Sequence, residues 1–157
     1  MRRLEAAPRT RAQLATTLRE RNVPDDVAQR VLDRFEEVAL IDDRAFAMMW
    51  VESRQRARHL SGRALRSELR TKGVPDELIN EAVGSVTAED ELRGAREVAA
   101  RKARSVVGLP RAVQVRRISG ALSRKGYGSA VCAQVVREAL ESLDSGEDEG
   151  QPTGSWD

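Results

Sequence analysis

Apolar residues recur along this chain at the three- and four-residue spacing of an α-helix, interrupted by short turns. The first such arrangement places two apolar pairs on either side of a turn at 21–24: Leu14 and Leu18, then Val27 and Val31. Apolar residues four positions apart lie on one face of a helix. The pattern therefore predicts a helical hairpin, which is a helix, a tight turn and a second helix.

The same arrangement occurs twice more, first 51 and then another 53 positions along, without an internal gap. The second copy holds Leu65, Leu69, the turn 72–75, Leu78 and Ala82, and the third holds Ile118, Leu122, the turn 125–128, Val131 and Val135. Self-similarity at a fixed period is the sequence signature of a repeat protein. We therefore expect three related hairpins.

The residues of the turns agree with this prediction. Gly73 and Gly126 suit the left-handed position that ends a helix, and Asn22 is the usual substitute for glycine there. Pro24 and Pro75 cannot continue the first helix of a hairpin but are favourable at the start of the second. Thr10 with Gln13 resembles a capping box, and Ser61 is expected to cap the first helix of the second hairpin.

Longer helices are predicted between the hairpins, over about 42–58 and 88–106. The apolar side of the first is expected to hold Phe46, Met49, Trp50 and Ala57. No alternation typical of β-strands persists anywhere. The predicted fold is all-α, with tandem three-helix repeats forming an elongated, curved array in which each repeat packs on its neighbours.

These elements divide the sequence into four segments, which are a first repeat at 1–38, a second at 39–87, a third at 88–143 and an acidic tail at 144–157. The first repeat lacks most of its leading helix, so the apolar face of its hairpin is expected to be partly uncovered. The tail consists mainly of Ser, Gly, Asp, Glu and Pro. It cannot bury enough apolar surface to order itself, so we expect it to be disordered.

The chain carries little of the chemistry that enzymes and metalloproteins use. Its single cysteine, Cys132, excludes an internal disulfide and a multi-cysteine metal site, and its lone histidine, His59, has no catalytic partner nearby in sequence. Asp42 and Asp43 directly precede a predicted helix, where acidic residues are favoured by capping and by the helix dipole. No glycine-rich phosphate-binding motif occurs. We expect no enzyme activity, no cofactor and no metal.

The apolar runs also bear on where the protein resides. None approaches the ~18 residues that a membrane-spanning helix requires. The basic N-terminus is not followed by the apolar stretch of a signal peptide. We expect a cytoplasmic monomer with no membrane partner.

Positive charge is concentrated in two stretches, although the net charge is only +2. A single acid lies in each stretch, Glu68 in 54–72 and Glu97 in 93–125, whereas a merely solvated helix face normally mixes both signs. Arginine outnumbers lysine, which favours bidentate contacts to carboxylate or phosphate. We therefore predict a partner-binding surface made by Arg54, Arg56, Arg58, Arg63, Arg66, Arg70 and Lys72 in the first stretch, and by Arg101, Lys102, Arg104, Arg116, Arg117, Arg124 and Lys125 in the second.

Three motifs resemble the RecX family, whose members regulate the bacterial recombinase RecA: LIDDRAFA at 40–47, Arg54-x-Arg56-x-Arg58, and the hairpin from Leu65 through Lys72-Gly73-Val74. The resemblance covers about 8–143. It implies a fold of tandem three-helix repeats. It also implies a protein that binds RecA or its filament on DNA and suppresses the ATPase, strand-exchange and coprotease activities of RecA.

Direct DNA binding through the basic helix faces is the alternative interpretation, because three similar hairpins suggest helix-turn-helix modules. The second helices of the first two hairpins open with Asp25-Asp26 and Asp76-Glu77, which would repel a phosphate backbone. No hairpin shows the cluster of Asn, Gln and Arg that reads base edges. These features favour a protein partner without excluding DNA.

Overall fold

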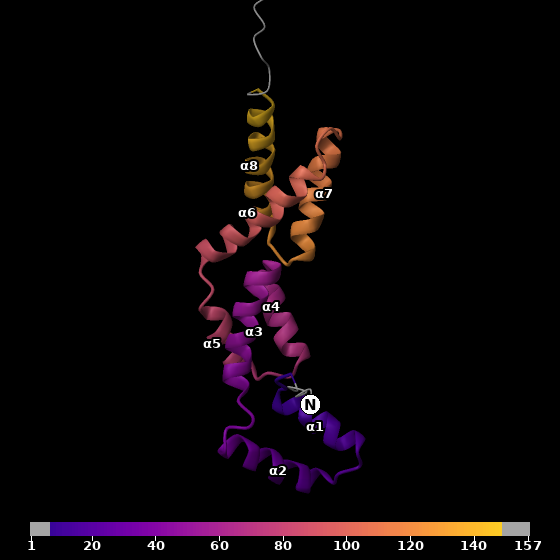
Figure 1. Ribbon diagram of the computed structural model, residues 1–157, viewed down its shortest axis with the longest axis vertical. Helices are drawn as coiled ribbons and strands as arrows, with labels where there is room; N and C mark the ends of the chain where they lie inside the picture. Colours follow the sequence, from indigo (N-terminus) through magenta and orange to yellow (C-terminus); the bar gives the residue numbers. More distant parts are fainter. Residues whose placement is uncertain (1–6, 149–157) are drawn as a thin grey trace, which may run out of the picture. The chain divides into compact units, whose positions relative to one another are not determined.

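The structure is a computed structural model that describes residues 7–148. Within this range the chain forms only α-helices (Figure 1). They are α1 (Arg11–Glu20), α2 (Asp25–Glu37), α3 (Asp43–Arg58), α4 (Gly62–Thr71), α5 (Asp76–Gly84), α6 (Ala88–Arg104), α7 (Arg111–Arg124) and α8 (Ser129–Asp148). The hairpins are α1–α2, α4–α5 and α7–α8, and the long helices α3 and α6 precede the second and third. The predicted all-α fold of tandem three-helix repeats is confirmed.

The helices group into two compact units. Unit 1 contains the described residues up to Ala57 together with Leu65–Val86, and unit 2 contains Arg58–Ala64 and the described residues from Thr87 onward. Unit 1 thus holds most of the first two predicted repeats. Unit 2 holds the third repeat together with the short segment 58–64 of the second.

Aliphatic side chains fill the core of each unit. Leu65 and Leu69 of α4 are fully buried in unit 1, and Ile118 and Leu122 of α7 are fully buried in unit 2. Alanines of α6, at positions 95, 99 and 103, line its buried face at four-residue spacing. Small side chains allow close helix packing, which explains how the chain folds with few aromatic residues.

The apolar face predicted for α3 was partly wrong. Phe46, Ala47 and Val51 are buried, whereas Met49 is 54% exposed and Ala57 is exposed. At 100° per residue, Ala47 and Val51 lie on one side of Phe46 and Met49 lies on the other. The prediction placed Met49 on the buried side, whereas packing buries the side that holds Ala47 and Val51.

One contact is repeated between successive hairpins. The Thr10 hydroxyl, just before α1, donates to the Lys72 carbonyl at 2.6 Å, and the backbone N–H of Ser61, just before α4, donates to the Lys125 carbonyl at 3.1 Å. Thr10 and Ser61 occupy equivalent positions in their repeats, as do Lys72 and Lys125. The start of each hairpin therefore packs on the turn of the next hairpin along the chain.

The glycines of these turns are required for two reasons. Gly73 and Gly126 have φ of +76° and +89°, which confirms the left-handed conformation predicted for them. A Cβ at Gly73 would collide with Ala12, and one at Gly126 would collide with Ser61. Asn22 also has a positive φ, of 60°, but is exposed. The first turn therefore tolerates a side chain where the other two do not.

The capping predictions are confirmed. Thr10 and Gln13 form a capping box at the start of α1. The Ser61 hydroxyl accepts from the backbone N–H of Ala64 at 3.2 Å. Asp42 accepts from Ala45 N–H at 2.9 Å, as expected for a helix cap.

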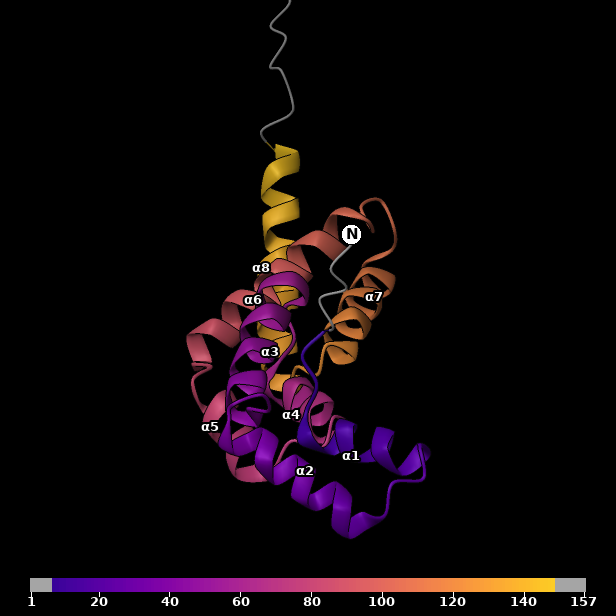
Figure 2. The same ribbon diagram turned by 60° about the horizontal axis from the view of Figure 1, so that its bottom comes forward.

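The hairpin α1–α2, labelled in Figure 2, leaves its apolar face partly uncovered, as predicted. No residue of α1 is fully buried, Leu14 and Leu18 are only partly covered, and Val27 is 37% exposed. By contrast, their counterparts Leu65 and Leu69 in α4 have no exposed surface.

We expect amide hydrogens of α1 to exchange faster than those of α4, because an element with few buried apolar contacts opens locally at low cost. Native-state hydrogen exchange of the full chain measures this directly, with α4 as the internal reference. Equal or greater protection in α1 would contradict the expectation.

Tyr127 joins the two parts of unit 2. Its hydroxyl donates to the carbonyl of His59 at 2.5 Å, and the side chain is only 6% exposed. His59 itself adopts a left-handed φ of 51°, directly after α3. The Tyr127 hydrogen bond thus ties the turn between α7 and α8 to the segment between α3 and α4.

Burial, assisted by the Glu91 carboxylate, raises the pKa of Tyr127 to about 12. The neutral phenol is therefore favoured in the folded state, and its contribution to stability is complete below the unfolded value of about 10 and lost as pH rises toward 12. Because Tyr127 is the only tyrosine, ultraviolet absorbance titration reports on it alone. A midpoint near 10 in folded protein would contradict this packing.

The predicted start of the acidic tail needs a correction. Helix α8 continues to Asp148, so 144–148 are helical rather than disordered. Asp144 pairs with Arg111, at the start of α7, at 3.2 Å, although both side chains are more than half exposed. The remainder of the predicted tail, 149–157, lies outside the described residues.

Candidate partner-binding surfaces

Three arginines of the predicted surface, Arg63, Arg66 and Arg70, form a stripe along α4 that neighbouring side chains partly occupy. Arg66 donates to the side-chain oxygen of Asn80, and Arg70 pairs with Asp76 at 3.2 Å. Arg63 is exposed and has no ion-pair partner among the described residues. An arginine that already has a partner offers less to a ligand, so this stripe is weaker than the sequence indicated.

Arg54 and Lys72 belong to a cation–aromatic cluster. The Arg54 guanidinium carbon lies 4.2 Å from the centre of the Trp50 ring, and the Lys72 ammonium nitrogen lies 4.3 Å from it. Glu68 accepts from the Trp50 indole N–H at 2.8 Å and lies 3.7 Å from Arg54. Phe46 stacks on Trp50 with ring centres 5.8 Å apart. The two cations are thus held in fixed positions by the indole.

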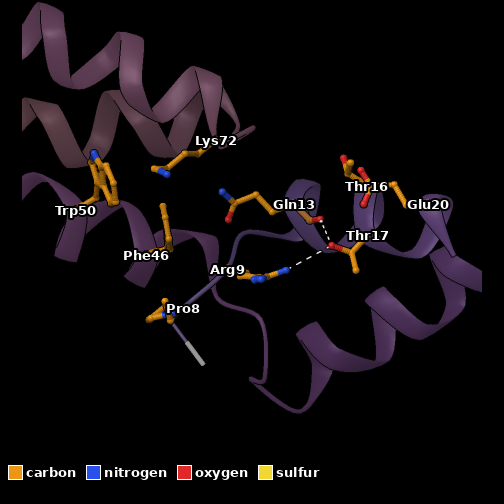
Figure 3. Close-up of a pocket in the computed structure, with 10 residues that line it drawn as sticks. Pro8, Arg9, Gln13, Thr16, Thr17, Glu20, Phe46, Trp50 and Lys72 are labelled. Atoms are coloured by element: carbon orange, nitrogen blue, oxygen red, sulfur yellow. Dashed lines mark hydrogen bonds between the residues drawn. The ribbon is translucent and has the colours of Figure 1, made fainter. Parts of the chain in front are cut away.

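A groove of about 480 Å³ opens beside this cluster within unit 1 (Figure 3). Phe46, Trp50 and Lys72 line one side of it, and Gln13 and Thr16 of α1 line the other. The groove therefore combines an aromatic surface, a cation and polar side chains. The sequence analysis placed Trp50 on an apolar helix face. The four-residue spacing of Trp50 and Arg54 was the available sign that the two side chains contact each other.

The remaining residues of the first basic stretch lie near the end of α3. Arg56 is exposed and forms an i,i+4 pair with Glu52 at 2.5 Å. Arg58 is exposed at the last position of α3 and belongs to unit 2. The predicted first stretch is therefore distributed over the two units, with Arg58 and Arg63 in unit 2 and its other residues in unit 1.

Helix α7 carries the most one-signed surface of the described chain. It contains four arginines and no acidic residue. Arg116, Arg117 and Arg124 are exposed and lie roughly 100–160° around the helix from the buried Ile118. None of the three has an ion-pair partner in the described part of the chain. We call these three residues the α7 arginine face.

The end of α6 adds a second cationic group. Arg101, Lys102 and Arg104 occupy its last turn, and no acidic side chain of residues 7–148 forms an ion pair with them. Cations are favoured there by the helix dipole, so stability accounts for part of this placement. Lys125, at the end of α7, is partly buried, and its carbonyl accepts from Ser61.

Asp43 has a role that the sequence did not indicate. Its carboxylate accepts from the backbone N–H of Arg11 at 2.9 Å, so it caps α1 from the start of α3. Arg11 also pairs with Asp33 and Glu36 of α2, at 2.7 and 3.0 Å. The acidic pair at 42–43 is thus structural, and among the described residues no cluster of three or more acidic, histidine or cysteine ligands could hold a metal ion.

The arrangement of hairpins matches that of a known protein family. A family model described as the first three-helix domain of RecX matches residues 1–35, and one described as the second matches residues 42–83. The regulatory protein RecX of Streptomyces coelicolor is 51% identical over 148 residues, which cover 94% of this chain and 78% of that relative. The chain belongs to the RecX family.

Further RecX relatives agree. The regulatory protein RecX of Thermobifida fusca is 44% identical and covers 90% of this chain, with 77% of the relative matched. The crystal structure of RecX from Lactobacillus salivarius has a TM-score of 0.77 at 18% identity and covers 88% of this chain and 90% of that one. The latter likeness establishes the fold. Among residues 7–148, no helix has both the length and the apolar composition to cross a membrane.

Proposed function

We propose that this RecX-family chain is a non-enzymatic regulator that binds RecA, or the RecA filament on DNA, and inhibits its ATPase, strand-exchange and coprotease activities. The family membership supports a regulatory role, and the RecA partner follows from the family resemblance. The observation that carries the binding proposal is the α7 arginine face, whose three guanidinium groups are exposed and have no acidic neighbour on their helix.

Arginine is suited to both surfaces that a RecA filament on DNA offers. Its planar guanidinium binds carboxylate or phosphate in a bidentate way, whereas lysine acts as a point charge. In this proposal the α7 arginine face and the last turn of α6 make the principal contacts. Arg63 and Arg58 add exposed charge, and Arg54 and Lys72 present the Trp50 cluster.

Direct DNA binding remains the second candidate, favoured by one difference between the hairpins. Helices α2 and α5 open with two acids each, whereas α8 has no acidic residue in its first turn. The third hairpin could therefore approach a phosphate backbone that the first two would repel. This mode would use the α7 arginine face without RecA.

Fluorescence anisotropy separates the two functions. A labelled single-stranded DNA is titrated with the chain, once bare and once coated with RecA, at several salt concentrations. We expect tighter binding to the coated DNA at physiological salt, because nonspecific DNA binding is weak there, with dissociation constants of about 10⁻⁴–10⁻⁶ M. Equal affinities with the same salt dependence would instead support the direct DNA-binding function.

A further inference from the structure

The third hairpin, α7–α8, shows how the apolar face of a hairpin in this chain is covered. Its residues Ile118, Leu122 and Val135 are at most 1% exposed. They share one core cluster with the alanines of α6 at positions 95, 99 and 103, and α6 packs against both α7 and α8. The cover of this hairpin is therefore a helix that presents small side chains at four-residue spacing.

The first hairpin, α1–α2, leaves the equivalent face open. Leu14, Leu18 and Val31 occupy the same repeat positions as the three buried residues of the third hairpin, but they are only partly covered. Val27 and Phe35 of α2 are 37% and 36% exposed, whereas their counterparts in α8 are partly buried against the core. Among the described helices, α1 and α2 pack mainly on each other. An apolar face of five side chains thus remains open to a further helix.

The open side chains of α2 form one continuous stripe. At 100° per residue, Val27, Val31 and Phe35 lie within about 80° of one another around the helix. They extend roughly 12 Å along its axis at 1.5 Å per residue. The α6 alanines that cover the third hairpin span the same number of residues, from 95 to 103. A helix of about two to three turns is therefore long enough to cover the stripe.

Charge contributes little to recognition at this face. The two arginines of α2, Arg30 and Arg34, already pair with Asp26 and Glu37 of the same helix, at 3.5 and 3.1 Å. A helix that docks here is therefore held by apolar contact. A second copy of this chain cannot supply its α6 for this purpose, because the α6 alanines are buried in its own unit 2.

We infer that the apolar face of α1–α2 docks an amphipathic helix of the protein partner, one that presents alanines or other small residues at four-residue spacing. The inference rests on the proposed function, in which that partner is RecA. Val27, Val31 and Phe35 pack on the small residues of the docked helix. This helix occupies on α1–α2 the place that α6 occupies on α7–α8.

The double variant Val27→Gln/Phe35→Gln tests this inference, because glutamine retains helix propensity and removes the apolar side chains. Its affinity for RecA-coated single-stranded DNA is measured by fluorescence anisotropy. We expect the affinity to fall about tenfold, since two apolar side chains no longer become buried on binding. The matched control is Met48→Gln/Met49→Gln, which should bind as the wild type does. These methionines are 44% and 54% exposed but belong to α3 rather than to the hairpin.

The outcomes separate this inference from the proposed function. Wild-type affinity in the folded α2 variant would overturn the inference alone, and so would an equal loss of affinity in the α3 control. A wild-type chain that does not bind RecA-coated DNA would overturn both. Self-association of the wild-type chain that the α2 variant abolishes would assign the face to a second copy, which also overturns the inference.

Hydrogen exchange of the wild-type chain gives the decision if the α2 variant fails to fold by circular dichroism. Amides of α1 and α2 should exchange about tenfold more slowly when RecA-coated DNA is present, because docking opposes local opening. Amides of α5 serve as the internal reference and should not change. Unchanged exchange in α1 and α2, at concentrations where anisotropy shows binding, would overturn the inference.

Discussion

Replacing Arg116, Arg117 and Arg124 with alanine is expected to weaken inhibition of RecA about a hundredfold. Each exposed arginine contact contributes roughly 1 kcal/mol, and each 1.4 kcal/mol changes an equilibrium tenfold. The fold should be retained, because all three side chains are exposed and such substitutions change stability by only about 0.5 kcal/mol. The measurement is the concentration of chain that halves the ATPase rate of RecA on single-stranded DNA.

The matched control is a triple alanine variant at Arg30, Arg34 and Arg44. It removes the same total charge, but these arginines pair with Asp26, Glu37 and Glu81. If the control weakens inhibition as much as the α7 variant, net charge matters and the α7 arginine face does not. Full inhibition by a folded α7 variant would remove this face from the proposed binding surface.

Gly126→Ala is expected to destabilise unit 2 by about 2–5 kcal/mol. A left-handed φ costs a non-glycine residue about 1–2 kcal/mol, and overpacking adds about 1–3 kcal/mol because the new Cβ collides with Ser61. This is a large fraction of the roughly 5–15 kcal/mol that stabilises a typical domain. Urea unfolding followed by circular dichroism measures the change in the free energy of unfolding.

Gly128→Ala provides the control within the same turn, because a Cβ at Gly128 meets nothing within 4 Å and its φ is not left-handed. Its effect should be a small fraction of that of Gly126→Ala. Similar effects of the two substitutions would show that the packing of Gly126 on Ser61 contributes nothing. The equivalent substitution, Gly73→Ala, should destabilise unit 1 for the same reason, since it collides with Ala12.

The sequence was sufficient to predict the hairpins because their signals are local. Apolar spacing, the Thr10–Gln13 capping box and the glycine or asparagine at each turn all depend on residues within a few positions of one another. Such signals do not require knowledge of the tertiary fold. The turn glycines show the limit of this approach. Their close packing on Ala12 and Ser61 depends on the start of the preceding hairpin, which lies far away in the sequence.

The candidate binding surfaces were only partly predictable. Sequence identified which residues are basic, but it could not show that Asp76 neutralises Arg70 or that Trp50 holds Arg54 and Lys72. Asp76 and Lys72 lie outside the helices that hold their partners Arg70 and Trp50, so these contacts follow from tertiary packing. The α7 arginine face emerged because its helix has no acid of its own and none of the described residues supplies one.

The most direct test of the proposed function is the ATPase rate of RecA on single-stranded DNA during titration with this chain. We predict that the rate falls as the wild-type chain is added and that the α7 triple alanine variant needs about a hundredfold more protein for the same effect. An ATPase rate that stays constant at chain concentrations well above that of RecA would contradict the account.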